Sequence, residues 1–265
     1  MTFSTAQYEA ALSAIDSGVQ KTQTKIGEVR PAAAAAVDHW YVPQAIADAV
    51  IWLADKAVDL AQKFLDTILD LLKGAVAPIF MFQDAWTWHG IAGKATTLGS
   101  SLDGAQLESR ITEHWQGDAV DAYKVAAAPQ ATAVNQIGSI ASSMAIALTV
   151  SAGAALAFYV ALGVIIGKFI IAMVGVVVAL GSVAFSWAGV LLAVEECGVN
   201  GALIATAVTA LLAALGVQVE RMIDMHGVLS SGTGFSDGSW PQAVTRGFSD
   251  ATVKDGDADW SVKTA

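Results

Sequence analysis

Charge, cysteine and proline are all scarce in this chain of 265 residues. Charged residues make up 14% of it, against roughly 25% in an ordinary soluble domain. The single cysteine, Cys197, excludes a disulfide framework and a multi-cysteine zinc site. The 14 lysines and arginines are outnumbered by 24 acidic residues and form no cluster, so the sequence lacks the basic stripe that nucleic acid binding requires. With only five prolines and several alanine-rich runs, the composition favours helices.

Motifs of catalysis and metal binding are also missing from the sequence. It contains no H-E-x-x-H pair, no P-loop and no G-x-S-x-G turn. The histidines are scattered rather than paired at metal-ligand spacing; they are His39, His89, His114 and His226. The sequence therefore predicts a protein that is not an enzyme and that has no catalytic residues, no metal and no cofactor.

Helical periodicity is strong in the first half of the chain. A narrow apolar stripe predicts a helix from Ser4 to about Ile26, with Ser4 as its cap and a break at Pro31. Apolar residues at three- and four-residue steps predict an amphipathic helix from Pro43 to Lys73, and a further helical pattern runs from Gly90 to about Pro129. We find no alternating strand pattern. The fold class that follows is all-α, an elongated helical bundle without a β-sheet.

A block of membrane-like hydrophobicity follows these polar helices. Three stretches carry no charge: 24 residues from Met144 to Gly167, 26 from Phe169 to Val194 and 21 from Val199 to Val219. Each exceeds the roughly 18–20 residues that are typical of a transmembrane helix. Lys168 separates the first two stretches, and Glu195 with Glu196 separates the second from the third.

These stretches predict an apolar helical hairpin that spans or inserts into a bilayer. In that interpretation Lys168 lies at the hairpin tip, and Glu195 and Glu196 return to the side of the polar helices. Gly163, Gly167 and Gly175 would allow the helix backbones to approach closely in lipid. The alternative is that the apolar helices are the buried centre of a large bundle.

Composition divides the chain into three parts. Residues 1–137 form a polar α-helical domain, and residues 138–224 form the apolar block with a third apolar helix. The remaining residues, 225–265, are rich in Ser, Gly, Asp and Thr and lack periodicity, which predicts a disordered polar tail.

A short motif lies between two helical patterns within the polar domain. Trp115-Gln116-Gly117 forms a W-x-G sequence, and the helix after it contains Ala122 and Tyr123 in an A-x-x-A-Y pattern. Glycine permits the chain to reverse, and tryptophan can pack back across a hairpin. The segment from about residue 90 to residue 137 therefore resembles the WXG100 superfamily of helical hairpins exported by type VII (ESX) secretion in actinobacteria. Together with the apolar block and the polar tail, it is similar to the larger ESX secretion-associated (Esp-like) proteins.

The resemblance implies a secretion substrate or secretion-associated protein whose partners are the type VII machinery or a co-secreted WXG100 or Esp-like protein. The start of the chain has no basic region followed by an apolar run, so we expect secretion or surface and membrane association without a cleavable signal peptide. The family's Y-x-x-x-[DE] export signal is missing, because Ala127 stands four residues after Tyr123. This departure favours export with a partner that supplies the signal, or no export.

Three functions follow as hypotheses. The first is a secreted or secretion-associated protein that associates with lipid membranes through the apolar hairpin, as pore-forming helical proteins do. The second is a self-assembling structural subunit, of a filament or surface coat, whose apolar helices pack in homo- or hetero-oligomers. The third is a resident membrane protein with three spans.

Overall fold

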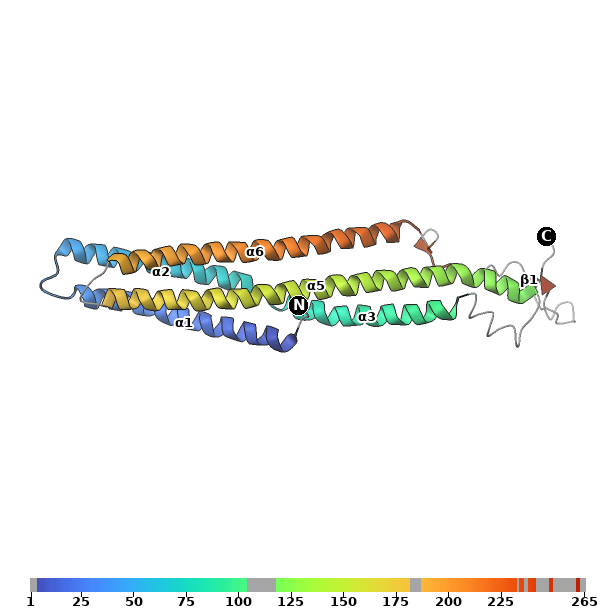
Figure 1. Ribbon diagram of the computed structural model, residues 1–265, viewed down its shortest axis with the longest axis horizontal. Helices are drawn as coiled ribbons and strands as arrows, with labels where there is room; N and C mark the ends of the chain where they lie inside the picture. Colours follow the sequence, from blue (N-terminus) through green and yellow to red (C-terminus); the bar gives the residue numbers. More distant parts are fainter. Residues whose placement is uncertain are drawn as a thin grey trace. The chain divides into compact units, whose positions relative to one another are not determined.

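The computed structural model of the chain is all-α, as the sequence predicts (Figure 1). It describes residues 4–103, 118–181, 187–232, 234–235, 238–241, 248–249 and 261–262. The helices in these residues are α1 (Thr5–Val37), α2 (Gln44–Leu72), α3 (Ala77–Ser101), α5 (Asp118–Gly181) and α6 (Trp187–Ser230). The expected absence of β-structure needs a small correction, because β1 (Phe248–Ser249) and β2 (Ser261–Val262) form a two-residue antiparallel pair.

Local sequence signals explain where the first two helices begin. The Ser4 hydroxyl accepts a hydrogen bond from the Gln7 amide at 3.4 Å, which satisfies one of the free N–H groups of the first turn of α1. Pro43 directly precedes α2, where its fixed φ suits a helix start. The predicted cap at Ser4 and the predicted helix from Pro43 to Lys73 are both confirmed.

Two predicted helix boundaries are wrong. The α1 helix continues through Pro31 to Val37, although proline in a helix interior costs about 3 kcal/mol. Val29 and Ala33, on either side of Pro31, are both fully buried, so tertiary packing offsets this cost. The helix predicted to begin at Gly90 instead begins at Ala77, and Gly90 lies in its interior.

The chain forms two compact units, each built from two separate stretches of sequence. Unit 1 contains Met1–Phe82 and Thr149–Val217, and unit 2 contains Gln83–Leu148 and Gln218–Ala265. Helices α3, α5 and α6 each run from one unit into the other. This division differs from the domains expected from composition, at 1–137, 138–224 and 225–265, because polar and apolar segments pack together within each unit.

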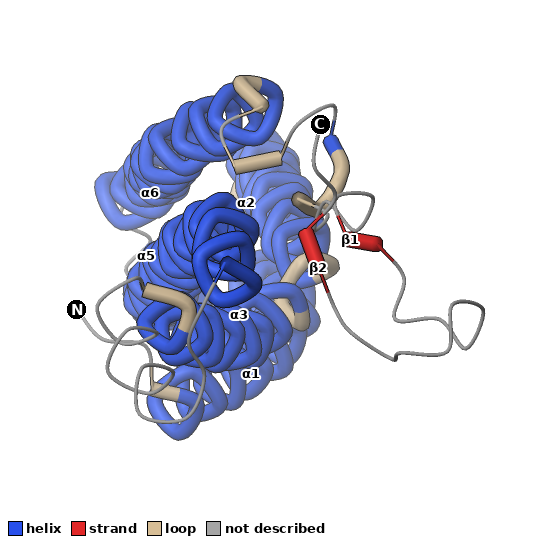
Figure 2. The backbone as a smooth tube through the Cα atoms, turned by 90° about the vertical axis from the view of Figure 1, so that its right-hand side faces the viewer, coloured by secondary structure: helices blue, strands red, loops and turns tan. Residues whose placement is uncertain are grey.

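Unit 1 is a bundle in which α1, α2 and α6 lie around the C-terminal half of α5 (Figure 2). A methyl group added at Gly163 of α5 would lie 3.7 Å from Ile15 of α1, and one added at Gly18 of α1 would meet Ile166 of α5. The residue numbers rise together, so α1 and α5 are parallel. Helix α2 runs antiparallel to α5, because Phe64 stacks on Phe169 while the later Leu71 contacts the earlier Tyr159.

Unit 2 joins α3, the N-terminal half of α5 and the end of α6. A methyl group added at Gly138 of α5 would lie 3.4 Å from the Cβ of Ala95, and one added at Gly99 of α3 would meet Asn135. The numbers run in opposite directions, so the two helices are antiparallel. The reversal predicted at Trp115–Gly117 lies outside the described residues.

The predicted disordered tail from residue 225 is wrong over its first part. Helix α6 continues to Ser230, and the Gln136 side-chain amide of α5 donates to the Val228 carbonyl at 3.1 Å. Beyond the helix, the Gln130 amide donates to the Pro241 carbonyl at 3.1 Å. Two glutamines of α5 therefore donate hydrogen bonds to backbone carbonyls of the tail, and hydrophobic periodicity in the sequence does not indicate these contacts.

Candidate apolar interaction surface

Helix α5 has a buried face and an exposed face within unit 1. Its buried face packs on α1 and α2 and contains Leu156, Tyr159, Leu162, Ile166, Phe169, Met173, Val176 and Leu180. The rings of Phe64 and Phe169 stack with centroids 3.9 Å apart. On this side the apolar sequence is the core of a bundle, which is the alternative that the sequence leaves open.

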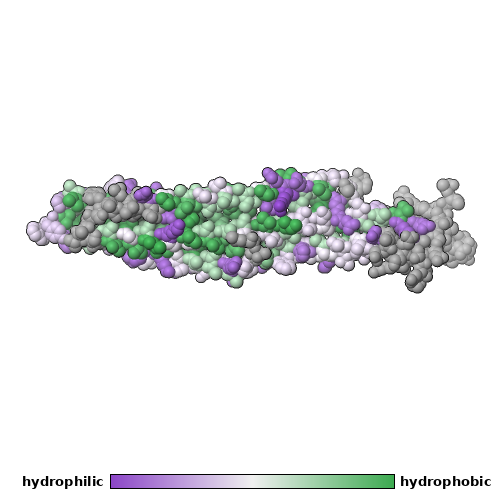
Figure 3. Space-filling model, viewed as in Figure 1, coloured by the Kyte–Doolittle hydropathy of each residue, from purple (hydrophilic) through white to green (hydrophobic). Residues whose placement is uncertain are grey.

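The opposite face of α5 exposes a row of branched apolar side chains. This α5 stripe consists of Val150, Val160, Val164, Ile171, Val174 and Val178. Ile171 is the most exposed of them, at 74%. On the face shown in Figure 3, hydrophobic surface gathers over the helices of unit 1. Several large apolar side chains exposed along one side of a helix are typical of a binding site for a membrane or another protein.

Helix α6 adds less-covered apolar surface in the same unit. Ile204 is buried, and Ala207, Val208 and Leu211 are only partly buried against the core. Val199, Leu203, Leu212 and Val217 are exposed. The hydroxyls of Thr206 and Thr209 donate to carbonyls four residues earlier, at 2.9 and 2.8 Å, so these polar groups are satisfied within the helix. Such internal bonds are compatible with an apolar environment.

Two helices in the described residues are long and apolar enough to cross a membrane, judged by length and composition. They cover Tyr123–Leu180 and Gly198–Ser230, and 33% and 11% of their most apolar windows are buried. Core helices of soluble proteins pass the same test, but they are mostly buried. The small buried share of the α6 window therefore distinguishes it from such a core helix. The three predicted apolar segments thus lie on two helices rather than three.

Lys168 is not a hairpin tip. It lies in the interior of α5, which is continuous from Asp118 to Gly181, and its side chain is exposed. The helix continues because Ile166 and Phe169, on either side of Gly167 and Lys168, are both buried in the core of unit 1. The correction removes the predicted hairpin of residues 144–167 and 169–194.

Glu195 and Glu196 do not separate two helices, contrary to the prediction. Both lie within α6, and Glu195 is exposed. Of the two long helices, α5 ends at Gly181 and α6 begins at Trp187. A charge at a solvent-facing helix position, such as Glu195, does not interrupt backbone hydrogen bonding, so charge alone is a poor marker of a helix boundary.

The glycines predicted to pack helices together do not share that role. Gly163 faces Ile15, but a methyl group added at Gly167 or Gly175 would meet nothing within 4 Å. The close approach occurs at Gly18 of α1, where an added methyl group would clash with Ile166. Gly18 lies three residues after the buried Ile15, and this spacing on an apolar stripe was the signal available in the sequence.

A buried tyrosine pair joins three segments of unit 1. The Tyr8 hydroxyl donates to the Ala75 carbonyl at 2.6 Å, and the Tyr159 hydroxyl donates to the Leu71 carbonyl at 2.9 Å. Their rings meet edge to face with centroids 5.5 Å apart. These bonds satisfy carbonyls at and after the C-terminus of α2, where helices leave acceptors free. Burial, and then the proximity of Tyr159, raise the pKa of the Tyr8 hydroxyl.

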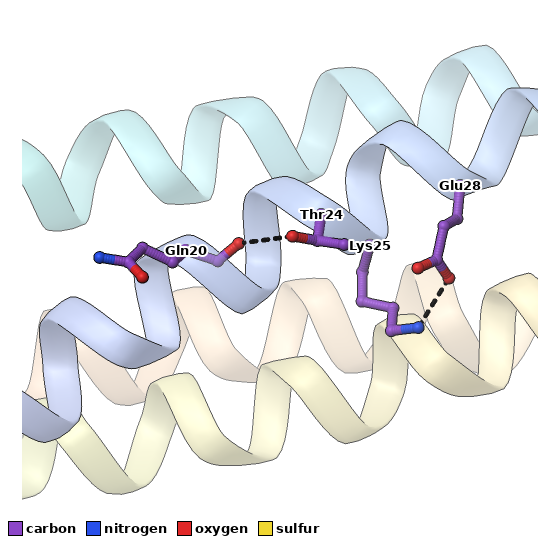
Figure 4. A network of polar contacts seen from close by, with 4 residues as sticks. All are labelled: Gln20, Thr24, Lys25 and Glu28. Atoms are coloured by element: carbon purple, nitrogen blue, oxygen red, sulfur yellow. Dashed lines mark hydrogen bonds and ion pairs between the residues drawn. The ribbon is translucent and has the colours of Figure 1, made fainter.

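The outward polar side of α1 is held by bonds within the helix itself (Figure 4). The Thr24 hydroxyl donates to the Gln20 carbonyl at 3.0 Å, and Lys25 pairs with Glu28 at 2.6 Å. The Lys25 and Glu28 side chains are partly exposed, at 30% and 41%, and a surface ion pair contributes about 0.2–1 kcal/mol. These contacts make the outer side of α1 polar and distinguish it from the α5 stripe.

Part of the predicted W-x-G site is described. Trp115 and Gly117 lie outside the described residues. Ala122 and Tyr123 lie in the first turns of α5, and Tyr123 is exposed. The packing of the tryptophan across the turn stays a prediction.

Comparisons with known protein families, curated proteins and solved structures give no match to this chain. Within the described residues, no group of three or more His, Cys, Asp or Glu side chains is arranged to hold a metal ion. The exposed apolar surface of α5 and α6 is therefore the feature on which a functional argument rests.

Proposed function

We propose that this chain is a non-enzymatic protein that associates with lipid membranes through the α5 stripe and the exposed apolar face of α6. The observation that carries the proposal is the exposure of six branched apolar residues in a row on α5. Fully burying an exposed side chain of this size contributes roughly 1.5–3 kcal/mol, and each stripe residue, 40–74% exposed, can contribute the corresponding part of this energy. The W-x-G resemblance supports the further proposal that the protein is a substrate or associated factor of type VII secretion, exported with a partner.

The length of α5 limits how it contacts a bilayer. Its 64 residues extend about 96 Å, whereas the hydrocarbon core is roughly 30 Å thick. Most of the helix therefore stays outside the core. The last 20 residues or so of α5, about the length that crosses a bilayer, contain four of the six stripe residues. These four are Val164, Ile171, Val174 and Val178. This end of the helix is the part that suits lipid contact.

Ile171→Asp tests the proposal, with Val125→Asp as its matched control. The two residues lie on the same helix and are 74% and 76% exposed, but Val125 is outside the stripe. We expect Ile171→Asp to weaken flotation with phosphatidylcholine vesicles at least about tenfold, because a carboxylate at the lipid surface opposes insertion. Both variants should keep the parent's helical circular dichroism. Flotation of Ile171→Asp equal to that of the parent contradicts the proposal.

The spacing of the stripe favours a second candidate function, self-assembly. Val164, Ile171 and Val178 recur every seven residues, the period of a helical seam between chains. In that case a detergent-free preparation forms a defined oligomer by light scattering, and Ile171→Asp dissociates it while vesicles leave it unbound. A chain that stays wholly in the membrane pellet after alkaline carbonate extraction would instead be a resident membrane protein.

The secretion proposal needs a separate measurement. The amount of chain in the medium is compared between hosts with an active and an inactivated type VII ATPase. Equal amounts in both media would contradict a secretion role and leave membrane association untouched.

A further inference from the structure

We propose that the loop between α1 and α2, residues Asp38 to Val42, is an aromatic anchor that inserts Trp40 and Tyr41 into the interface of a zwitterionic bilayer. This inference rests on the proposed membrane association and names the part of the molecule that makes the contact. We call these five residues the aromatic loop.

The aromatic loop presents large side chains to solvent without a packing role. Trp40 is 97% exposed, the highest value among the exposed large hydrophobic residues described, and Tyr41 is 51% exposed. A tryptophan that adds nothing to the core still exposes a large apolar area to water, and Trp and Tyr are enriched at surfaces that are half apolar and half wet. Its exposure therefore favours a function in binding.

The backbone and the rings hold the loop in one arrangement. The Val42 amide donates to the His39 carbonyl at 3.0 Å, which closes a turn, and Pro43 then leads into α2. The His39 and Tyr41 rings stack with centroids 5.2 Å apart, and the Trp40 ring meets Tyr41 edge to face at 6.0 Å. A preformed loop loses little conformational entropy on binding.

Within unit 1, the aromatic loop lies next to the C-terminal end of α5, the part proposed to contact lipid. In the parallel pair of α1 and α5, Ile15 lies opposite Gly163 and Gly18 opposite Ile166, so both pairs differ by 148 residues (163 − 15 and 166 − 18). With an equal rise per residue, Ala33 is level with Gly181 at the end of α5, and α1 ends about one turn further on, at Val37. Figure 1 shows the α1–α2 connection at the same end as the last turns of α5.

Charge identifies the kind of membrane. No lysine or arginine occurs from residue 38 to residue 55, where Asp38, Asp48 and Asp55 lie, and Arg30 of α1 pairs with Asp55 at 2.8 Å. Anionic headgroups and acidic proteins are recognised through clusters of Lys and Arg, which this end of the molecule lacks. Indole and phenol rings settle at the headgroup level of any bilayer, including a neutral one. A zwitterionic interface is therefore the surface that fits the aromatic loop.

The double variant Trp40→Ala/Tyr41→Ala tests the proposal in the full chain. Trp86→Ala is the matched control, because Trp86 lies on α3 in unit 2 and is also well exposed, at 65%. Both proteins are measured with phosphatidylcholine vesicles by flotation. We expect the double variant to lose at least about tenfold in vesicle partitioning and the control to stay within about twofold of the parent.

A second measurement reports on contact directly. Tryptophan fluorescence of the parent is recorded on vesicles that contain brominated phosphatidylcholine, which quenches only indoles at lipid depth. We expect quenching in the parent and in Trp86→Ala, and clearly less of it in Trp40→Ala, which removes the proposed inserted indole.

The outcomes separate the two proposals. A parent that fails to bind vesicles refutes the proposed membrane association. Where the parent does bind, either of two results refutes the aromatic anchor alone. One is a double variant that binds vesicles as well as the parent does, and the other is quenching in Trp40→Ala equal to that in the parent. Loss of a protein oligomer in the double variant, with vesicle binding unchanged, also refutes the anchor and assigns the loop to a protein partner.

Discussion

The Tyr8 hydroxyl and its 2.6 Å bond to the Ala75 carbonyl are fully buried in unit 1. We expect Tyr8→Phe to lower the free energy of unfolding by about 1–3 kcal/mol, because it leaves a buried carbonyl without this donor. Tyr41→Phe, at an exposed position, should change it by less than about 0.5 kcal/mol. Urea denaturation followed by circular dichroism measures both. Equal stability of Tyr8→Phe and the parent would contradict a structural role for this bond.

The same hydroxyl predicts a pH dependence of stability at alkaline pH. Its pKa is raised by burial and then by Tyr159, so the folded state holds the proton more tightly than the unfolded chain does. Stability linked to this proton is complete below the unfolded pKa of about 10 and falls as pH rises above it toward the folded pKa. We expect the parent's stability advantage over Tyr8→Phe to shrink by about 1 kcal/mol from about pH 10 to about pH 11. An advantage that stays constant over that range would contradict the raised pKa.

Single residues were the hardest features to predict from the sequence. Tyr8 and Tyr159 are more than a hundred positions apart, and nothing local indicates that both donate to carbonyls near the end of α2. The Ser4 cap was predictable because its partner lies three residues away. Local hydrogen bonds leave a signature in spacing, whereas bonds across a bundle depend on a packing that one sequence does not reveal.

At the scale of helices, α1 approaches α5 at Gly18. Gly18→Ala places a methyl group against Ile166, a buried β-branched residue with little freedom to move. Overpacking costs about 1–3 kcal/mol and exceeds the gain of roughly 1 kcal/mol in helix propensity, so we expect net destabilisation.

Gly27→Ala, on the same helix, is the control for this substitution. A methyl group there meets nothing within 4 Å, so the propensity gain should stabilise the protein by about 0.5–1 kcal/mol. Thermal melting of both variants therefore gives shifts of opposite sign. Two stabilised variants would show that α1 and α5 are farther apart at Gly18 than described.

Helix α2 was predicted within a residue or two, because charged residues on its outer side make its amphipathic period clear. Helix α5 was not, because Gly167 and Lys168 resemble a break in an otherwise uniform apolar sequence. An all-apolar stretch has no period that shows which side is covered. The division of α5 into a buried face and the α5 stripe therefore comes from α1 and α2, not from its own residues.

At the scale of the whole molecule, a net charge of −10 predicts how vesicle binding depends on lipid and salt. Anionic headgroups repel an acidic protein that lacks a basic patch, and salt screens this repulsion. We expect less protein to float with vesicles that contain roughly 30% phosphatidylserine than with vesicles of pure phosphatidylcholine. Binding to the anionic vesicles should recover as the ionic strength rises from about 0.05 to about 0.5 M. Binding that is strongest on anionic vesicles at low salt would point to a basic surface formed outside the described residues.

The two-part construction of unit 1 has a consequence for biosynthesis. The apolar faces of α1 and α2 pack on each other and on residues 152–180 of α5, and residues 83–148 of unit 2 are synthesised in between. At roughly 5–20 residues per second, several seconds pass in which the first two helices lack the α5 part of their core. During that interval a chaperone or partner that recognises amphipathic helices can bind the nascent chain. The order of the segments along the sequence therefore determines when such a partner can bind.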